Sequence, residues 1–155
     1  MRLVFSGFFL PLVLIGFGRV LPAQQVSTSA HERSLLAESF AREKLSVWQK
    51  RLNLQDWNVA LEVVRSTELR PKSLGNIHWD TDKKTAVIRV LDPADYSLPF
   101  PEILHDMEFT VVHELIHLEI APVLSRFTRS DADRIEEEHA VNYMADALLR
   151  LDRGR

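Results

Sequence analysis

Apolar residues between positions 30 and about 52 recur at the spacing of one face of a helix. Polar and charged residues fill most of the positions between them. The pattern predicts an amphipathic helix from Ala30 to about Leu52, which the polar stretch 53–56 ends. The apolar positions of this helix are Leu36, Phe40, Leu45, Val47, Trp48 and Leu52.

The period of the apolar residues then changes from that of a helix to two. The alternating residues are Trp57, Val59, Leu61 and Val63. This alternation predicts a strand with one buried face over residues 57–64. Two further strand-like runs, 74–79 and 85–91, are separated by the turn-rich segment 80–84, as in a hairpin. We therefore expect a small three-stranded, largely antiparallel sheet.

Helical spacing returns in the last third of the chain. One helix is predicted from near Pro101, a favoured residue in a first turn, to Ala121, where Pro122 ends it. A final helix runs to about Leu151, with Ser130 or Asp131 as its N-cap. The predicted order is one helix, three strands and two helices, which is an α+β fold.

The composition agrees with one globular domain and excludes several functions. The chain has 155 residues, of which 46% are hydrophobic, enough for a single core. Its net charge of −3 gives no basic surface, so nucleic acid is not an expected partner. The absence of cysteine excludes disulfides, thiol chemistry and cysteine-ligated zinc. Three tryptophans are expected in the core: Trp48, Trp57 and Trp79.

The first 23 residues have the layout of a secretory signal peptide. Arg2 precedes an apolar run over residues 3–17, and Ala23 supplies a small residue at a cleavage site before Gln24. The run is shorter than the roughly 20 residues that span a bilayer. We expect a signal peptide over residues 1–23 and one domain over residues 24–155, secreted or periplasmic, with an uncleaved anchor as the alternative.

The penultimate predicted helix contains the motif VVHELIHLE over residues 111–119. On a helix His113 and His117 lie one turn apart and about 40° apart around the axis, so both imidazoles can bind one zinc ion. Glu114 lies beside the metal, where it would accept a proton from the water that zinc activates. The apolar residues around the motif imply a buried helix, in which unpartnered histidines are costly. The alternative is a pair of hydrogen-bonded core histidines.

A catalytic zinc site of this kind needs a third protein ligand. No glycine or histidine follows His117 at the spacing of the extended motif, so the ligand is expected from the last helix. Glu137 and Glu138 both border the apolar stripe of that helix, and Glu136 points away from it. Asn142, one turn after Glu138, is placed to orient a ligand. This favours Glu138, with Glu137 as the alternative.

These two segments resemble the gluzincin branch of zinc metallopeptidases. In that branch HExxH on one helix is completed by a glutamate on a following helix, often in an E-x-x-A-[ND] setting. Here Val141 replaces the usual alanine and Asn142 matches. The short order of elements is similar to minimal gluzincin domains, and more loosely to ImmA/IrrE-like and SprT-like peptidases. The resemblance implies His113, His117 and Glu138 as zinc ligands and Glu114 as general base.

Four other residues are candidates for the same site. His78 lies on an expected edge strand, where it either faces a substrate cleft or is an ordinary surface residue. Arg134 and Tyr143 are candidates for stabilising an oxyanion, or else only pair and pack. Asp106 lies two turns before His113, either as its hydrogen-bond partner or as a polar residue of the helix start.

The expected function is that of an exported zinc metalloendopeptidase with one Zn²⁺ per chain and a peptide or protein as substrate. The first alternative is an exported, non-enzymatic sensor or interaction domain that retains the zinc site. The second is a structural domain without metal. No nucleic acid is expected as a partner, and no membrane after signal cleavage.

Overall fold

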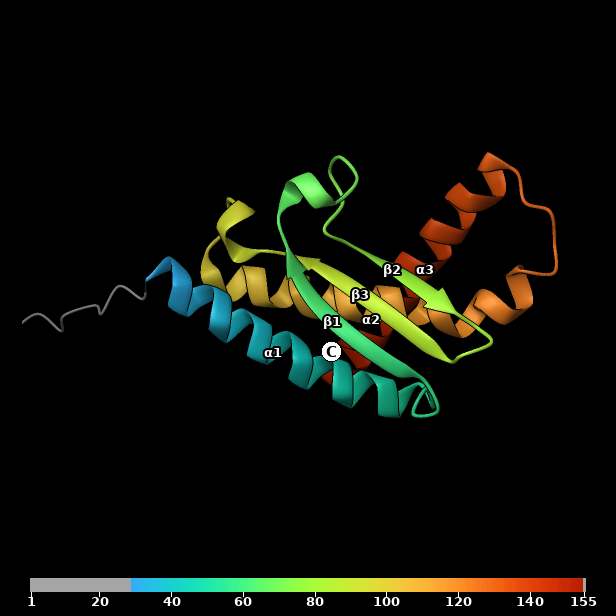
Figure 1. Ribbon diagram of the computed structural model, residues 1–155, viewed down its shortest axis with the longest axis horizontal. Helices are drawn as coiled ribbons and strands as arrows, with labels where there is room; N and C mark the ends of the chain where they lie inside the picture. The colour runs from blue at the N-terminus through green and yellow to red at the C-terminus, as the bar shows by residue number, and fades with distance from the viewer. Residues whose placement is uncertain (1–28, 155) are drawn as a thin grey trace, which may run out of the picture.

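The predicted order of elements is confirmed in a computed structural model of the chain, which describes residues 29–154 (Figure 1). The signal peptide expected over residues 1–23 lies outside the described residues. Within the described part, no helix is both long and apolar enough to cross a membrane. The helices and strands are α1 (Ala30–Arg51), β1 (Asn58–Val64), β2 (Gly75–Asp80), β3 (Thr85–Leu91), α2 (Phe100–Leu124) and α3 (Asp131–Asp152).

The three strands form one sheet in the order β1-β3-β2. β2 and β3 make the expected antiparallel hairpin, whereas β1 pairs with β3 in parallel, so the sheet is mixed. β3 buries Ala86, Ile88 and Val90, and this strongly apolar strand takes the centre of the sheet. The segment 65–74 carries the chain from β1 to the far side of β3 and leaves β2 as an edge strand.

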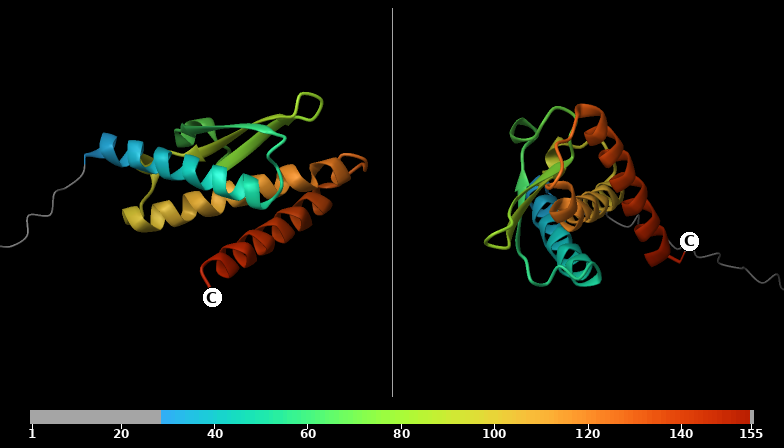
Figure 2. Two further views of the ribbon diagram at one scale, coloured as in Figure 1. Left: turned by 90° about the horizontal axis from the view of Figure 1, so that it is seen from below. Right: turned by 90° about the vertical axis from the view of Figure 1, so that its right-hand side faces the viewer.

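The elements lie in three layers, with the sheet on one side, α1 and α2 in the middle and α3 beyond α2 (Figure 2). α2 is therefore covered by the sheet and α1 on one side and by α3 on the other. Val111, Leu115 and Leu118 are fully buried, and so is Val112 on another side of the helix. This position explains why α2 is apolar around most of its circumference.

The structure confirms one predicted helix end and corrects another in the last two helices. Ser130 is the N-cap of α3, and its hydroxyl accepts a hydrogen bond from the Asp133 backbone while the Asp133 side chain caps Ser130 in return. The prediction that α2 ends at Ala121 is wrong, because the helix continues through Pro122 to Leu124. Pro122 removes one backbone hydrogen-bond donor, and the helix continues for only two residues beyond it.

The three tryptophans do not share one environment. Trp48 and Trp57 are buried in the core, as expected. The core prediction for Trp79 is wrong, since this side chain is 42% exposed. It lies near the end of the edge strand β2, which has a neighbouring strand on one side only.

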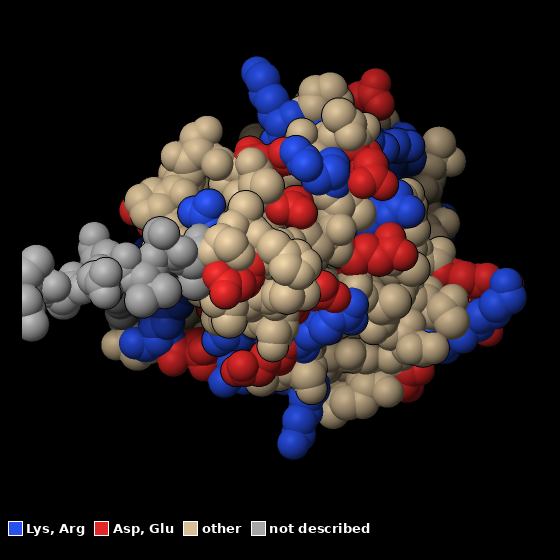
Figure 3. Space-filling model, turned by 60° about the vertical axis from the view of Figure 1, so that its left-hand side comes forward, with Lys and Arg blue, Asp and Glu red and all other residues tan. Residues whose placement is uncertain are grey.

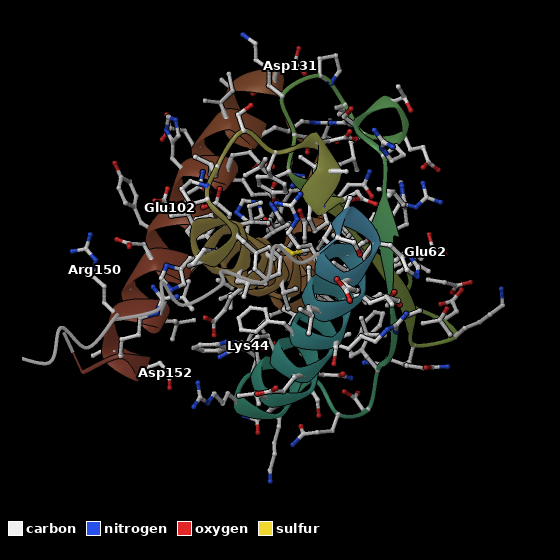
Figure 4. All side chains as sticks on the ribbon, turned by 90° about the vertical axis from the view of Figure 1, so that its left-hand side faces the viewer. Lys44, Glu62, Glu102, Asp131, Arg150 and Asp152 are labelled. Atoms are coloured by element: carbon white, nitrogen blue, oxygen red, sulfur yellow. The ribbon has the colours of Figure 1, made fainter. Side chains whose placement is uncertain are left out.

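Glu108, a buried carboxylate on α2, joins the three helices. It accepts hydrogen bonds from Trp48 Nε1 at 3.1 Å and from Arg153, just after α3, at 3.1 Å. Lys44 on α1 forms an ion pair with it, also at 3.1 Å. Figure 4 looks roughly along α2 and labels Lys44 on α1 and Asp152 at the end of α3. Burial alone would raise the pKa of Glu108, but these donors outweigh it and hold the pKa below its ordinary value.

We expect Glu108→Gln to lower the free energy of unfolding by about 2 kcal/mol at pH 7, because the two cations lose their buried carboxylate. The lowered folded-state pKa means that this contribution is present above the ordinary value of 4.5 and is lost as the pH falls through the folded-state value. Urea unfolding of both proteins should therefore show a stability difference that shrinks below about pH 4.5. Glu43→Gln, an exposed site on α1, is the control and should show no difference. A pH-independent difference would contradict the assignment.

Candidate metal centre

His113 and His117 lie one turn apart on α2 and turn their rings toward the same point. Their Nε2 atoms are 3.0 Å apart. Both side chains are largely buried, with 13% and 10% of their surface exposed, because the surrounding apolar residues of α2 fill the core. The convergence expected from the i, i+4 spacing is therefore present.

The last helix brings a carboxylate to the same point. Glu138 Oε2 lies 3.3 Å from His113 Nε2, and its Oε1 lies 3.4 Å from His117 Nε2. The three residues thus form a group whose ligand atoms all lie within 4.8 Å of one another and can hold a metal ion. The Glu138 side chain is 55% exposed, so the group is open to solvent on the α3 side.

Glu137, the alternative third ligand, lies on the other side of the ring of His117. Its Oε1 is 3.1 Å from His117 Nδ1, the nitrogen that faces away from the centre. Its second oxygen accepts from Arg129, in the segment between α2 and α3. Asn142 has the corresponding position at His113, with Oδ1 3.1 Å from Nδ1. The structure thus places Glu138 among the converging atoms and Glu137 behind a histidine.

These outer contacts determine what the centre can bind. An acceptor at each Nδ1 holds the ring proton there, so a neutral histidine presents an unprotonated Nε2 to the centre. In that tautomer the two Nε2 lone pairs and the Glu138 carboxylate are acceptors that face one another. Such a set of acceptors is stabilised by a cation, and two imidazoles with one carboxylate suit a transition metal. The residues present therefore fit a metal ion.

Glu114 is the buried carboxyl group next to the centre. Only 7% of its surface is exposed. Burial first, and then the nearby carboxylate of Glu138, raise its pKa to about 8. Burial and the neighbouring His117 hold the pKa of His113 below its ordinary value. A carboxyl group with a pKa near neutrality is suited to accept and return a proton.

A cleft of about 430 Å³ opens above the histidines. Edge strand β2, the histidine-bearing part of α2 and the first half of α3 supply its lining. β2 approaches α2 closely because Gly75 has no side chain. A Cβ atom at Gly75 would overlap the side chain of Thr110 on α2 and the backbone oxygen of Arg89. The cleft therefore has an unpaired strand edge along one wall and the metal centre at its floor.

The other candidates are distributed between the cleft and the rest of the surface. His78 and Arg134 both line the cleft. Tyr143 is 77% exposed and is not among the lining residues, so it is not placed to stabilise an oxyanion. Asp106 is not a partner of His113, since Asn142 takes that position. Asp106 instead accepts a hydrogen bond from Thr110 through its backbone carbonyl.

The pair formed by Arg129 and Glu137 behind His117 does not follow from the sequence pattern. Arg129 lies in an irregular segment before α3, where periodicity gives no orientation. The sequence pattern predicts Glu137 only as an alternative metal ligand and not as the partner of His117 Nδ1. A carboxylate adjacent in sequence to a metal ligand is a recognisable signal for a histidine partner, since ligand histidines commonly donate their second N–H to a carboxylate.

Comparisons of the chain with protein-family models, curated proteins and solved structures found no match. No family is therefore assigned to the chain. The candidate metal centre is supported by the HExxH segment on α2, by the segment 138–142 on α3 and by the contacts between them.

Proposed function

We propose that the protein is a zinc-dependent metalloendopeptidase. The observation that carries the proposal is the convergence of both histidine Nε2 atoms and the Glu138 carboxylate beside buried Glu114, at the floor of an open cleft. Zinc fits this donor set, which is typical of zinc hydrolases, and the HExxH spacing with Glu114 beside the two histidines favours zinc over iron(II). The resemblance of the HExxH and E-x-x-V-N segments to gluzincins supports the same reaction.

Each residue has a distinct part in the proposed hydrolysis. A bound zinc ion supplies the Lewis acid that lowers the pKa of water and polarises the scissile carbonyl. Glu114 accepts the proton of the attacking water and passes it to the nitrogen of the leaving amine. His113, His117 and Glu138 hold the metal, and Asn142 and Glu137 fix the two imidazole rings.

The shape of the cleft supports a polypeptide substrate. β2 is an edge strand whose outer side has no neighbour in the sheet, and it runs along the cleft beside the metal centre. An extended peptide can pair with such an edge and present its backbone to the histidines. The proposal includes export, on the signal-peptide pattern of residues 1–23.

The test is to measure metal content and peptide cleavage on the same purified protein. We expect about one zinc ion per chain and cleavage of an unfolded protein substrate that a chelator stops and added zinc restores. His113→Ala should lose both the metal and the cleavage. Protein that binds zinc at this site but cuts no member of a broad peptide library would overturn the enzymatic proposal in favour of a zinc-binding interaction domain.

A further inference from the structure

The charges that line the cleft divide into two groups. Three carboxylates and three guanidinium groups contribute to its lining. The carboxylates are Glu114, Glu137 and Glu138, and the guanidinium groups are Arg70, Arg129 and Arg134.

All three carboxylates have a partner or a place within the metal centre. Glu138 lies against both histidines, and Glu137 pairs with His117 and with Arg129. Glu114 is buried beneath the cleft. Glu137 thus neutralises Arg129, and within residues 29–154 none of the three carboxylates pairs with Arg70 or Arg134.

Arg70 and Arg134 are in a different position. Within residues 29–154 neither guanidinium group takes part in an ion pair or a side-chain hydrogen bond, and both residues are exposed. Arg70 lies just before edge strand β2, and Arg134 lies near the start of α3, so each wall of the cleft carries one. On the face in Figure 3, basic and acidic side chains are interspersed.

We propose that Arg70 and Arg134 select peptides that carry a carboxylate close to the bond that is cut. The inference rests on the proposed peptidase function and names its substrate class. A peptide lying along β2 passes between the two arginines, so a carboxylate of the peptide meets a guanidinium group from either wall. The carboxylate comes from an aspartate or glutamate side chain or from the C-terminus of the peptide.

Apolar lining residues give the same cleft a second contact with peptide side chains. Trp79 on β2 and Ile135 on α3 both line it and are 42% and 56% exposed. Ile135 directly follows Arg134, so an acidic residue next to an apolar residue suits this wall of the cleft. An acidic peptide with an aromatic or aliphatic neighbour is therefore the substrate to test first.

The experiment uses three peptides with one apolar core sequence and measures kcat/KM with the zinc-loaded protein. The first has glutamate on both sides of the core and blocked termini, the second has glutamine there, and the third has glutamine and a free C-terminal carboxylate. Exposed ion pairs of this kind imply a preference of about fivefold for a carboxylate-bearing peptide at low salt. The preference should decrease as salt is raised. Which of the two carboxylate peptides is preferred identifies the source.

Variants then test the assignment to the two arginines. The double variant Arg70→Gln/Arg134→Gln should reduce the preference to about one, whereas Lys72→Gln/Arg126→Gln should keep it, because neither control residue lines the cleft. An equal kcat/KM for all three peptides, or a preference that survives the arginine double variant, would overturn the inference.

A binding measurement separates this inference from the proposed function. Fluorescence anisotropy of labelled peptides with zinc-loaded Glu114→Gln protein measures affinity without cleavage. The expected result is again about fivefold tighter binding of a carboxylate peptide, lost in the arginine double variant. If no peptide is cut by wild type but this binding difference is present, the hydrolysis proposal fails and the selectivity stands. Equal affinities would overturn the selectivity alone.

Discussion

Replacement of Glu114 by glutamine is expected to lower kcat/KM for peptide cleavage about 10³-fold while the protein still binds one zinc ion. Glutamine has nearly the same shape as glutamate but cannot accept a proton from the attacking water. The proposed metal ligands His113, His117 and Glu138 are unchanged, so metal affinity is expected to stay within a small factor of wild type. The measurements are peptide kinetics and metal content on the same samples.

Glu119→Gln is the matched control, because Glu119 is an exposed glutamate on the same helix and does not line the cleft. Its kinetics should equal those of the wild type. A Glu114→Gln protein that retains wild-type cleavage would remove Glu114 from the mechanism. A Glu114→Gln protein that has lost its zinc would instead show that Glu114 supports the metal, and the role of general base would be wrong.

The sequence predicts α1 correctly as an element but only part of its buried face: Leu45 and Trp48 are buried as expected. The large residue Leu36 was expected to face the core and is 53% exposed, whereas Ala37 and Ala41 are fully buried. Alanines at the contact let α1 approach α2 closely, and a search for large apolar side chains does not detect such a face. The helix is recognised from its period, but its rotation depends on the partner helix.

The pairing of the strands is also only partly predictable from the sequence. The hairpin of β2 and β3 follows from the local turn segment between them, so it is predictable. The parallel pairing of β1 with β3 is a contact between segments that are not adjacent in the chain. Packing of the sheet against α1 and α2 favours the most apolar strand, β3, at the centre. β1 therefore pairs with β3 and not with β2.

The parts of the candidate metal centre that depend only on the geometry of one helix are predictable from the sequence. The i, i+4 spacing places His113 and His117 together, and one helical turn relates Glu138 to Asn142. The choice between Glu137 and Glu138 depends on how α3 is rotated and tilted against α2. The apolar period of α3 alone does not determine this orientation. Arg129 lies in an irregular segment, so its contact with Glu137 becomes visible only in the folded chain.

The run Glu136-Glu137-Glu138 provides a graded test of the coordination. Glu138→Gln removes a ligand and is expected to cause the largest loss of zinc affinity of the three. Glu137→Gln leaves the ligands in place and weakens the contact that fixes His117, so a loss of about 10- to 100-fold is expected. Glu136 is exposed and does not line the cleft, so Glu136→Gln should bind zinc like the wild type.

Competition with a chromophoric chelator measures the three affinities, and thermal unfolding of the metal-free proteins shows whether each variant folds. The absorption spectrum of the cobalt-substituted proteins adds a readout of coordination. It should change in Glu138→Gln, which loses a ligand, and keep its band pattern in Glu137→Gln, which does not. A larger loss of affinity and a changed spectrum in Glu137→Gln, with Glu138→Gln close to wild type, would exchange their roles. The assigned coordination predicts a different loss for each of the three adjacent glutamates, according to its contacts with His113 and His117. Equal losses in all three variants would contradict it and would indicate a general effect of acidic charge on α3.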